Sequence, residues 1–367
     1  MCCYVLIVSP LTTPGTVTTC TTARSATSPM ARTEVHGRPD RLRAMRAIVR
    51  SRYGGPEVLQ LLEVETPSPQ GDEVLIRVRA SSMNMADVDY ITGRPRATRF
   101  GTGLREPRAR VPGIDMAGEV ESVGPDVRRL KAGDRVFADL TDEGSGAWAE
   151  YVAVPETALT AIPDGVSFEA AAATPSAGIF AIQGVRDKRP VRAGERVLVN
   201  GASGNVGSFA VQIAKAHGAE VTGVCRTEKM DMVRAIGADH VIDYTVEDYR
   251  TGGQRYDLII DMAARGGIVG IRRSLNRGGG YVLIGGTGWA YLQAGLLGVP
   301  VGLMTGRKLG MLMWRVNDSR DMADLAAMLA DGRIRPHIDR TYSLEEVPDA
   351  LAYVQSGDFR GKVVIVV

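Results

Sequence analysis

A strand-like segment at residues 196–200 runs directly into a turn of small residues. Such a turn can bind the pyrophosphate of a dinucleotide when a helix follows, because the backbone approaches the phosphates and the first helical N–H groups point at them. Ala202, Gly204 and Gly207 occupy the small positions of the G-x-G-x-x-G fingerprint, before helical periodicity over residues 208–217. We therefore predict a dinucleotide site, with a purely structural turn as the alternative. The residues between the small positions, included in this site, are Ser203, Asn205 and Val206.

The next strand-like segment, residues 220–225, bears on the choice of nicotinamide cofactor. An NAD site carries Asp or Glu about 20 residues after the glycines, where the carboxylate binds the ribose 2′-hydroxyl. Here the strand is followed by Arg226 and Thr227, with Lys229 shortly after. The two cations could pair with a 2′-phosphate and the threonine hydroxyl could donate to it. NADPH is favoured over NADH, although Glu228 is adjacent and the cations could instead be solvated surface charges.

The order of strand-like and helical segments divides the chain. Short alternating apolar runs separated by Gly, Pro and Asp predict an all-β section from residue 45 to about 162. Further strand-like segments at 220–225, 240–243, 256–262 and 280–285, with a helix from about residue 227, follow at βαβ spacing. They predict an α/β fold with a doubly wound parallel sheet. The expected domains are 45–168, completed by 319–367, and a nucleotide-binding domain at 169–318.

Several later segments connect these domains. Residues 170–184 are typical of an apolar helix, residues 319–330 of an amphipathic helix and residues 362–367 of a strand that could return to the first domain. Residues 289–315 are rich in Leu, Met and Gly and are interrupted by Pro300. This apolar insertion could be a lid, an oligomer contact or a weak membrane-surface patch. Its Gly and Pro content argues against a membrane span.

Composition limits the classes of function. The chain has 367 residues, with 44 basic and 42 acidic side chains, and this near balance gives no indication of nucleic-acid binding. Three of its four cysteines lie in the first 44 residues, which excludes a disulfide framework for the body and fits a cytoplasmic location. Residues 1–44 are expected to be a disordered extension, because Ser, Thr and Pro bury too little apolar surface. We hypothesise that Met45 is the functional start.

Six segments together carry a resemblance to a known family. They are residues 83–87 (MNMAD), 111–118 (VPGIDMAG), 133–136 (GDRV), 149–151 (AEY), 201–207 (GASGNVG) and 360–364 (RGKVV). With the order of parts, they resemble the medium-chain dehydrogenase/reductase superfamily, in its zinc-independent quinone oxidoreductase-like branch, over nearly everything after Met45. The resemblance implies a GroES-like β-rich catalytic domain built from both chain ends, a Rossmann domain between them and an active site in the cleft. It also favours a homodimer.

The same resemblance argues against a catalytic zinc. Zinc-dependent relatives carry Gly-His-Glu where this chain has Gly113, Ile114 and Asp115, and an isoleucine cannot bind a metal. The histidines of the body show no ligand spacing, and Cys225 is its one cysteine. We therefore expect no zinc.

The resemblance also suggests residues at the active site. Asn84 and Tyr90 match the segment that faces nicotinamide and substrate in related reductases, although a turn-supporting Asn84 and a packed Tyr90 are the structural alternatives. Thr174 and Ser176 resemble residues at the nicotinamide end of the cofactor, in a segment where Phe180 stands in place of a common threonine. Two further matches are Tyr244, near the adenosine phosphate, and the glycine pair beside the carboxamide, Gly285 and Gly286.

These observations favour an NADPH-dependent, zinc-independent oxidoreductase that transfers hydride to a small-molecule quinone or α,β-unsaturated carbonyl. In such an enzyme the cofactor supplies the redox chemistry and the protein supplies binding, orientation and a dry cleft. A metal-free alcohol dehydrogenase or an enoyl-thioester reductase is one alternative. A non-catalytic NADPH-binding sensor or structural protein is another.

Overall fold

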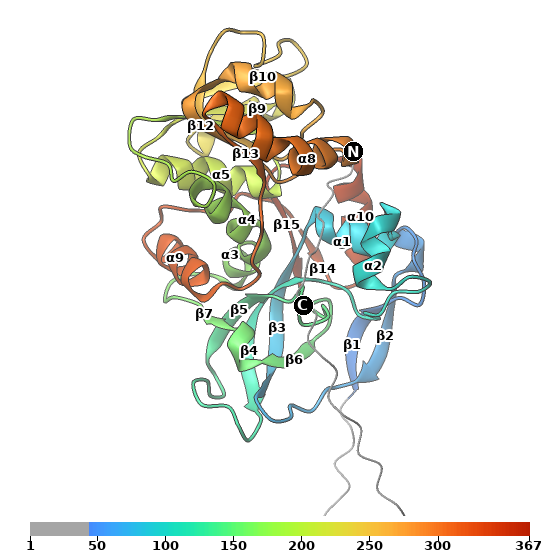
Figure 1. The fold of residues 1–367 in the computed structure, drawn as a ribbon. Helices are drawn as coiled ribbons and strands as arrows, with labels where there is room; N and C mark the ends of the chain where they lie inside the picture. The colour runs from blue at the N-terminus through green and yellow to red at the C-terminus, as the bar shows by residue number, and fades with distance from the viewer. Residues whose placement is uncertain (1–43) are drawn as a thin grey trace, which may run out of the picture.

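The computed structural model describes residues 44–367. The expected extension at residues 1–44 therefore lies, apart from Ala44, outside the described part of the chain. Figure 1 shows two main sheets, a mixed one in the lower half of the molecule and a parallel one in the upper half. A two-stranded antiparallel ribbon, β1 (Ala44–Val49) and β2 (Gln60–Glu65), flanks the lower sheet.

The upper sheet has six parallel strands in the order β10-β9-β8-β11-β12-β13. Its central strands are buried apolar runs, as expected when helices cover both faces. The strand order reverses between β8 and β11, and ligands bind outside the carboxyl ends of strands at such a point. The predicted doubly wound sheet is thus present. Its strands are β8 (Arg196–Asn200), β9 (Glu220–Cys225), β10 (His240–Asp243), β11 (Tyr256–Asp261), β12 (Leu275–Leu283) and β13 (Lys308–Met311).

The lower sheet joins the two ends of the described chain. The last strand, β15 (Lys362–Val366), pairs antiparallel with β3 (Glu73–Met83), which in turn pairs with β4 (Asp115–Val123). Figure 1 shows β15 close to β3, so the terminal strand does return to the first section. The remaining strands are β5 (Arg135–Asp139), β6 (Tyr151–Pro155), β7 (Thr160–Ala161) and β14 (Ile338–Ser343).

Two expectations about the helices require correction. The section from residue 45 to 162 is not all-β, because α1 (Met85–Thr92) and α2 (Arg99–Thr102) follow β3. The helix expected at 170–184 is divided into α3 (Phe168–Ala172) and α4 (Pro175–Arg186), since Pro175 suits the first turn of a helix and not its interior. The other helices are α5 (Asn205–Ala216), α6 (Met230–Ala235), α7 (Ile268–Ile271), α8 (Gly288–Thr305), α9 (Ser319–Ala330) and α10 (Val347–Ser356).

Helix α4 connects the two halves of the molecule. Each residue from Pro175 to Val185 is buried, and one apolar cluster extends from Phe137 of the lower sheet through Ile179 to Val197 of the upper sheet. Such a shared core restricts relative movement of the halves and keeps the crevice between them in shape.

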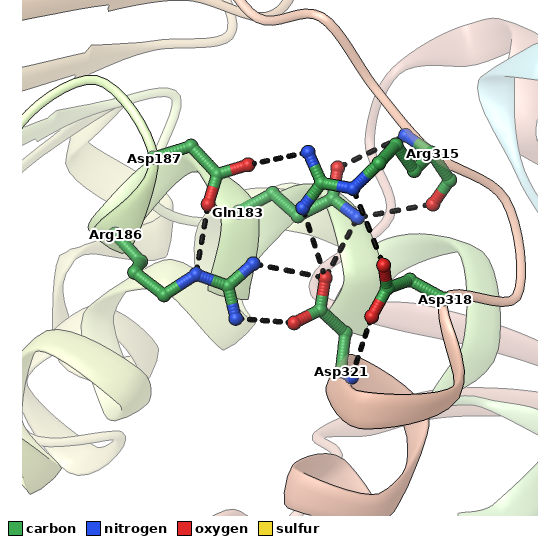
Figure 2. A network of polar contacts seen from close by, with 6 residues as sticks. All are labelled: Gln183, Arg186, Asp187, Arg315, Asp318 and Asp321. Atoms are coloured by element: carbon green, nitrogen blue, oxygen red, sulfur yellow. Dashed lines mark hydrogen bonds and ion pairs between the residues drawn. The ribbon is translucent and has the colours of Figure 1, made fainter.

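A polar network ties the end of α4 to the start of α9 (Figure 2). The carboxylate of Asp321, fully buried, accepts hydrogen bonds from Gln183 at 2.9 Å and from both terminal nitrogens of Arg186. Arg315 lies 3.5 Å from the same carboxylate and also contacts Asp318, which caps α9 by accepting from the Asp321 N–H. The network fixes the position of α9 against the connecting helix.

Replacing Asp321 by asparagine should lower the free energy of unfolding by about 2 kcal/mol, because it removes charge-assisted hydrogen bonds. The loss stays moderate because the partner side chains of Arg186 and Arg315 are 29% and 48% exposed and can be hydrated. Urea unfolding measures the effect. Asp231→Asn is the control, because this exposed carboxylate pairs with Arg234 at the surface and should contribute less than about 1 kcal/mol. Equal losses in both variants would contradict the structural role of the network.

Candidate active site

A cavity of about 340 Å³ opens at the reversal point of the parallel sheet. Its walls come from the carboxyl ends of β8, β9 and β11, the segment after β12 and the N-terminus of α5. The start of α1 and the end of α10 close it from the other half of the molecule. Eleven of the residues predicted from the sequence line this cavity: Asn84, Ser176, Ser203, Gly204, Asn205, Val206, Gly207, Arg226, Lys229, Tyr244 and Gly285.

The small-residue turn forms the floor of the cavity. Gly204 caps α5, and the first N–H groups of a helix have no partner within it, so the turn can bind an anion. A Cβ at Gly207 would lie 2.1 Å from the Gly201 carbonyl oxygen, whereas one at Gly204 would meet that atom at 3.4 Å and nothing closer. Gly207 therefore allows α5 to pack against the strand, and Gly204 leaves space for a ligand.

Asn205 provides a test of whether a cofactor fits. Its side-chain Nδ2 donates to the Met83 carbonyl at 3.0 Å, while its buried Oδ1 has no hydrogen-bond partner within residues 44–367. A buried acceptor without a donor is costly unless a ligand supplies one. A ribose hydroxyl or an amide of a dinucleotide would do so, and the residues of the turn therefore fit the cofactor.

Cations gather at the β9 end of the cavity. The Nε of Arg226 donates to the Tyr244 hydroxyl at 2.9 Å, and its guanidinium remains 45% exposed. Lys229 donates to the carbonyls of Gly357 and Phe359, both at 2.7 Å, and burial, with the neighbouring Arg226 charge, lowers the pKa of its amine. Two of its three donor positions are thus used by the protein, and Arg226 is the cation more open to a ligand.

Arg265 belongs to the same group of cations, although it was not predicted as a site residue from the sequence. It follows β11, lines the cavity and places its guanidinium 5.3 Å from the centre of the Tyr244 ring. The acidic side chains of Glu228 and Asp358 approach Arg226 to 3.6 and 3.8 Å from the solvent side. The β9 end nevertheless combines three cations with an aromatic surface.

A buried polar cluster underlies the opposite end, at Asn84. The Asn84 Nδ2 donates to Asp115 at 2.8 Å, and its Oδ1 accepts from the amine of Lys362 at 2.6 Å. Lys362 and Asp115 are both fully buried and form an ion pair at 3.2 Å. The remaining hydrogen bonds to the Asp115 carboxylate come from the Ser82 hydroxyl at 2.8 Å and the Ser176 N–H at 2.9 Å. Together they fix the orientation of the Asn84 amide.

Strand pairing explains why these distant residues meet. Ser82 of β3 lies opposite Asp115 of β4 and also opposite Val364 of β15, two residues from Lys362. Asn84 follows β3 directly and caps α1. Asp87 completes this cap by accepting from the Asn84 N–H at 2.8 Å, and burial raises the pKa of its carboxyl to about 7.

Five predicted site residues do not line the cavity. Thr227 donates its hydroxyl to Asp243, so it is not aimed at a 2′-phosphate. Thr174 is fully buried and donates to the Ala170 carbonyl, while Ser176 lines the cavity in its place. The others are Tyr90, Ala202 and Gly286.

A structural reason explains why the cavity is not lined by Tyr90, Ala202 or Gly286. Tyr90 lies on α1, outside the cavity wall, and burial, with the nearby Asp139 charge, raises the pKa of its phenol far above its usual range. Ala202 is fully buried at the contact between the turn and Gly207. Gly286 pairs with Ala264, whose side chain and carbonyl a Cβ at Gly286 would meet at 2.7 Å.

Comparisons with known proteins identify the family. A family model described as "Alcohol dehydrogenase GroES-like domain" matches residues 70–164, and one described as "Zinc-binding dehydrogenase" matches residues 236–365. A quinone oxidoreductase of Lama guanicoe is 34% identical over 338 residues, which cover 88% of this chain and 98% of that protein. The chain belongs to the medium-chain dehydrogenase/reductase superfamily. Within it, the chain falls in the quinone oxidoreductase-like branch.

Other members of this superfamily are similar over most of their length. The NADPH-dependent alkenal/one oxidoreductase of Arabidopsis thaliana is 33% identical over 332 residues, covering 88% of this chain and 79% of that protein. The solved structure of the quinone oxidoreductase from Coxiella burnetii superposes with a TM-score of 0.77 at 28% identity, covering 89% of this chain and all of the other. The expected fold class, a GroES-like β-rich part with a Rossmann sheet, is confirmed.

One of the two matching family models is described as zinc-binding, but this chain lacks a histidine at a position where zinc-dependent relatives carry one. Ile114, at the histidine position of zinc-dependent relatives, is buried in the apolar interior. Within residues 44–367 no three His, Cys, Asp or Glu side chains are placed to hold a metal ion. Cys225 lines the cavity, but burial raises the pKa of its thiol to about 11, which opposes the thiolate form that binds zinc. Zinc independence remains a prediction.

Proposed function

We propose that this member of the superfamily reduces quinones or α,β-unsaturated carbonyl compounds with NADPH, without a metal. The observation that carries the proposal is one continuous cavity with an anion-binding turn at its floor, cations at its β9 end and the fixed amide of Asn84 at its other end. The names of the two reductase relatives support the same reaction class. The proposal includes the predicted cytoplasmic location and homodimer, which rest on composition and on the resemblance.

In this arrangement the turn would hold the pyrophosphate. Arg226 and Arg265 would contact the 2′-phosphate, because guanidinium groups pair well with phosphate oxygens. The opposite end of the cofactor would then lie beside Asn84, Ser176 and Gly285. When bound, NADPH supplies a hydride from its nicotinamide ring.

The proposed part of Asn84 is to bind the acceptor. The Nδ2 of Asn84 donates one hydrogen bond to Asp115, and its Oδ1 accepts one from Lys362. The amide therefore cannot flip without breaking charge-assisted hydrogen bonds. Asn84 lines the cavity, and within residues 44–367 its Nδ2 donates only to Asp115. In this proposal the second Nδ2 proton would be donated to the carbonyl oxygen of the substrate. A fixed donor at the atom where negative charge develops stabilises the transition state. In this proposal, water would supply the proton that completes the reduction.

The acceptor class is tested by following NADPH oxidation with 1,4-benzoquinone, 9,10-phenanthrenequinone and but-3-en-2-one, before and after treatment with a chelator. We expect turnover that chelation leaves unchanged. Activity that the chelator abolishes would contradict the metal-free proposal. Oxidation of secondary alcohols without reduction of any quinone or enone would indicate an alcohol dehydrogenase, and tight NADPH binding without any turnover would indicate a sensor.

Arg226→Gln should raise the KM for NADPH by about tenfold, because one charged hydrogen bond to phosphate contributes roughly 1.5–3 kcal/mol and Arg265 remains. The KM for NADH should change by less than about twofold, since NADH has no phosphate for this side chain to pair with. Steady-state kinetics with both cofactors measure the difference. Arg234→Gln, on α6 and paired with Asp231, is the control. Equal effects of Arg226→Gln on both cofactors would refute the phosphate assignment.

A further inference from the structure

Helix α8 buries mostly small residues and exposes large apolar ones, the reverse of an ordinary amphipathic helix. Its small residues Ala290, Ala294, Gly298 and Gly302 face inward, and a Cβ at Gly298 would lie 3.0 Å from the Leu309 carbonyl of β13. The large apolar residues face outward instead. They are Trp289, Leu292, Leu296, Leu297, Val299, Leu303 and Met304, which are 39–86% exposed. Small residues thus bring α8 close to the sheet and leave a continuous apolar surface on the opposite side, larger than scattered exposed residues would give.

The sequence segment that contains α8 is strongly basic. Residues 262–317 contain no Asp or Glu but seven basic residues, whereas the whole chain has a net charge of only +2. Helix α8 itself carries no charged residue. The basic residues of the segment are Arg265, Arg272, Arg273, Arg277, Arg307, Lys308 and Arg315.

Several of these cations gather at the C-terminal end of α8. Arg307 donates to the carbonyl of Thr305, the last residue of the helix, at 3.0 Å. Arg307 also donates to the Leu275 carbonyl at 3.0 Å, which places it beside the segment of Arg272 and Arg277. Burial lowers the pKa of Arg307, and the nearby positive charges of Arg255, Arg272 and Arg277 lower it further. The most exposed apolar residues of α8, Leu303 and Met304, lie at this same end. An apolar surface and a cluster of cations are therefore adjacent. Figure 1 shows α8 in the upper half of the molecule, beside β13.

We propose that α8 and the arginines at its end form a docking surface for an anionic phospholipid membrane. A helix with an exposed apolar face and adjacent cations lies in the headgroup layer, with its apolar side chains among the acyl chains and its cations against lipid phosphates. Trp289, 62% exposed at the start of α8, is of the residue type favoured at the membrane interface. No helix within residues 44–367 is long and apolar enough to cross a bilayer, so the contact is with one leaflet.

Charge favours a membrane over a second copy of the chain. In a two-fold contact the same surface faces itself. Because residues 262–317 contain no acidic side chain, the arginines would find no carboxylate of that segment in the partner and would repel one another. Anionic headgroups supply the missing negative charge. The proposal does not depend on the reductase activity, although α8 begins just after Gly285 of the cavity wall and would bring the cavity near the lipid surface.

The test is vesicle flotation of the full chain. We expect binding to mixed phosphatidylcholine and phosphatidylglycerol vesicles, weak binding to phosphatidylcholine alone, and release by salt. Leu296→Gln/Leu303→Gln should weaken binding by about tenfold or more, because both side chains lose acyl contacts. Arg272→Gln/Arg273→Gln/Arg277→Gln should weaken binding to the anionic vesicles by about tenfold or more and leave the weak phosphatidylcholine binding unchanged.

Matched variants outside the surface separate docking from general effects. Leu104→Gln/Val246→Gln removes two exposed apolar side chains elsewhere, and Arg105→Gln/Arg108→Gln removes two exposed cations elsewhere. Both should bind vesicles like the unmodified chain, and circular dichroism checks that each variant is folded. Absence of flotation with the unmodified chain, or equal losses in the matched variants, would overturn the proposal. So would sedimentation showing that Leu296→Gln/Leu303→Gln dissociates an oligomer without changing vesicle binding.

Discussion

Gly207→Ala should destabilise the fold by about 3 kcal/mol and weaken NADPH binding by more than about tenfold, because the new methyl group overlaps backbone atoms that cannot rotate away. The added Cβ would lie 2.1 Å from the Gly201 carbonyl oxygen and 2.8 Å from the Ala202 Cα. Alanine in a helix gains up to about 1 kcal/mol over glycine, which is too little to offset this overlap. Helix α5 would therefore move away from β8 and carry the anion-binding turn with it.

Gly204→Ala provides the contrast within the same turn. The backbone at Gly204 is extended, with a φ of −87°, and accepts any residue. The added Cβ meets only the Gly201 oxygen, at 3.4 Å. Stability should change by less than about 0.5 kcal/mol. NADPH binding should still weaken by about tenfold, because the methyl group occupies the space into which the pyrophosphate fits. Thermal unfolding and fluorescence titration measure the two quantities, and equal stability losses in both variants would contradict this division of roles.

Lys362→Met should lower the free energy of unfolding by about 3 kcal/mol, because Asp115 would remain buried without its cation. Three hydrogen-bond donors to the Asp115 carboxylate remain, from Ser82, Asn84 and Ser176. The expected loss is therefore at the lower end of the range of stability losses for a broken buried ion pair. The kcat should fall by about tenfold while the KM for NADPH stays nearly constant, since the Asn84 amide is no longer fixed and the cofactor contacts are unchanged.

The second change Asp115→Asn, added to Lys362→Met, removes the unpaired charge and should restore part of the stability but not the kcat. Lys215→Met is the matched control, because Lys215 pairs with Asp239 at 2.8 Å where both side chains are about one-third exposed. Its loss should stay below about 1 kcal/mol. A Lys362→Met variant with unchanged kcat would remove Lys362 from its proposed positioning role.

Local patterns were sufficient to predict the parts of the fold that depend on neighbouring residues. The small-residue turn, the strands of the parallel sheet and the amphipathic helix α9 each follow from periodicity within one segment. Periodicity alone left the return of the terminal strand open, and the family resemblance supplied that expectation. The pairing of β15 with β3 was not specified, because an apolar strand has no feature that selects its partner. The buried cluster around Asp115 depends on that pairing and was not predicted.

Side-chain direction explains why some site residues lie elsewhere in the structure than the sequence predicted. Thr227 follows β9, and its hydroxyl reaches Asp243 at the end of the neighbouring strand β10, a contact set by the register between two strands. Arg265 reaches the cavity from the segment after β11, and no local pattern shows that it meets Tyr244. In α8 the positions of the large apolar residues would indicate the wrong buried face, because its buried positions carry mostly small residues and its exposed positions carry large ones.

The central claim is direct hydride transfer from NADPH to an acceptor held at Asn84. The most direct test uses NADPH deuterated at C4, with each face labelled separately, and but-3-en-2-one as the acceptor, followed by mass spectrometry of the butan-2-one product. We predict that deuterium from one face appears at C4 of butan-2-one, the former terminal alkene carbon, because a fixed cavity presents one face of the ring to the substrate. NADPH oxidation that yields product without deuterium from either label would contradict the account.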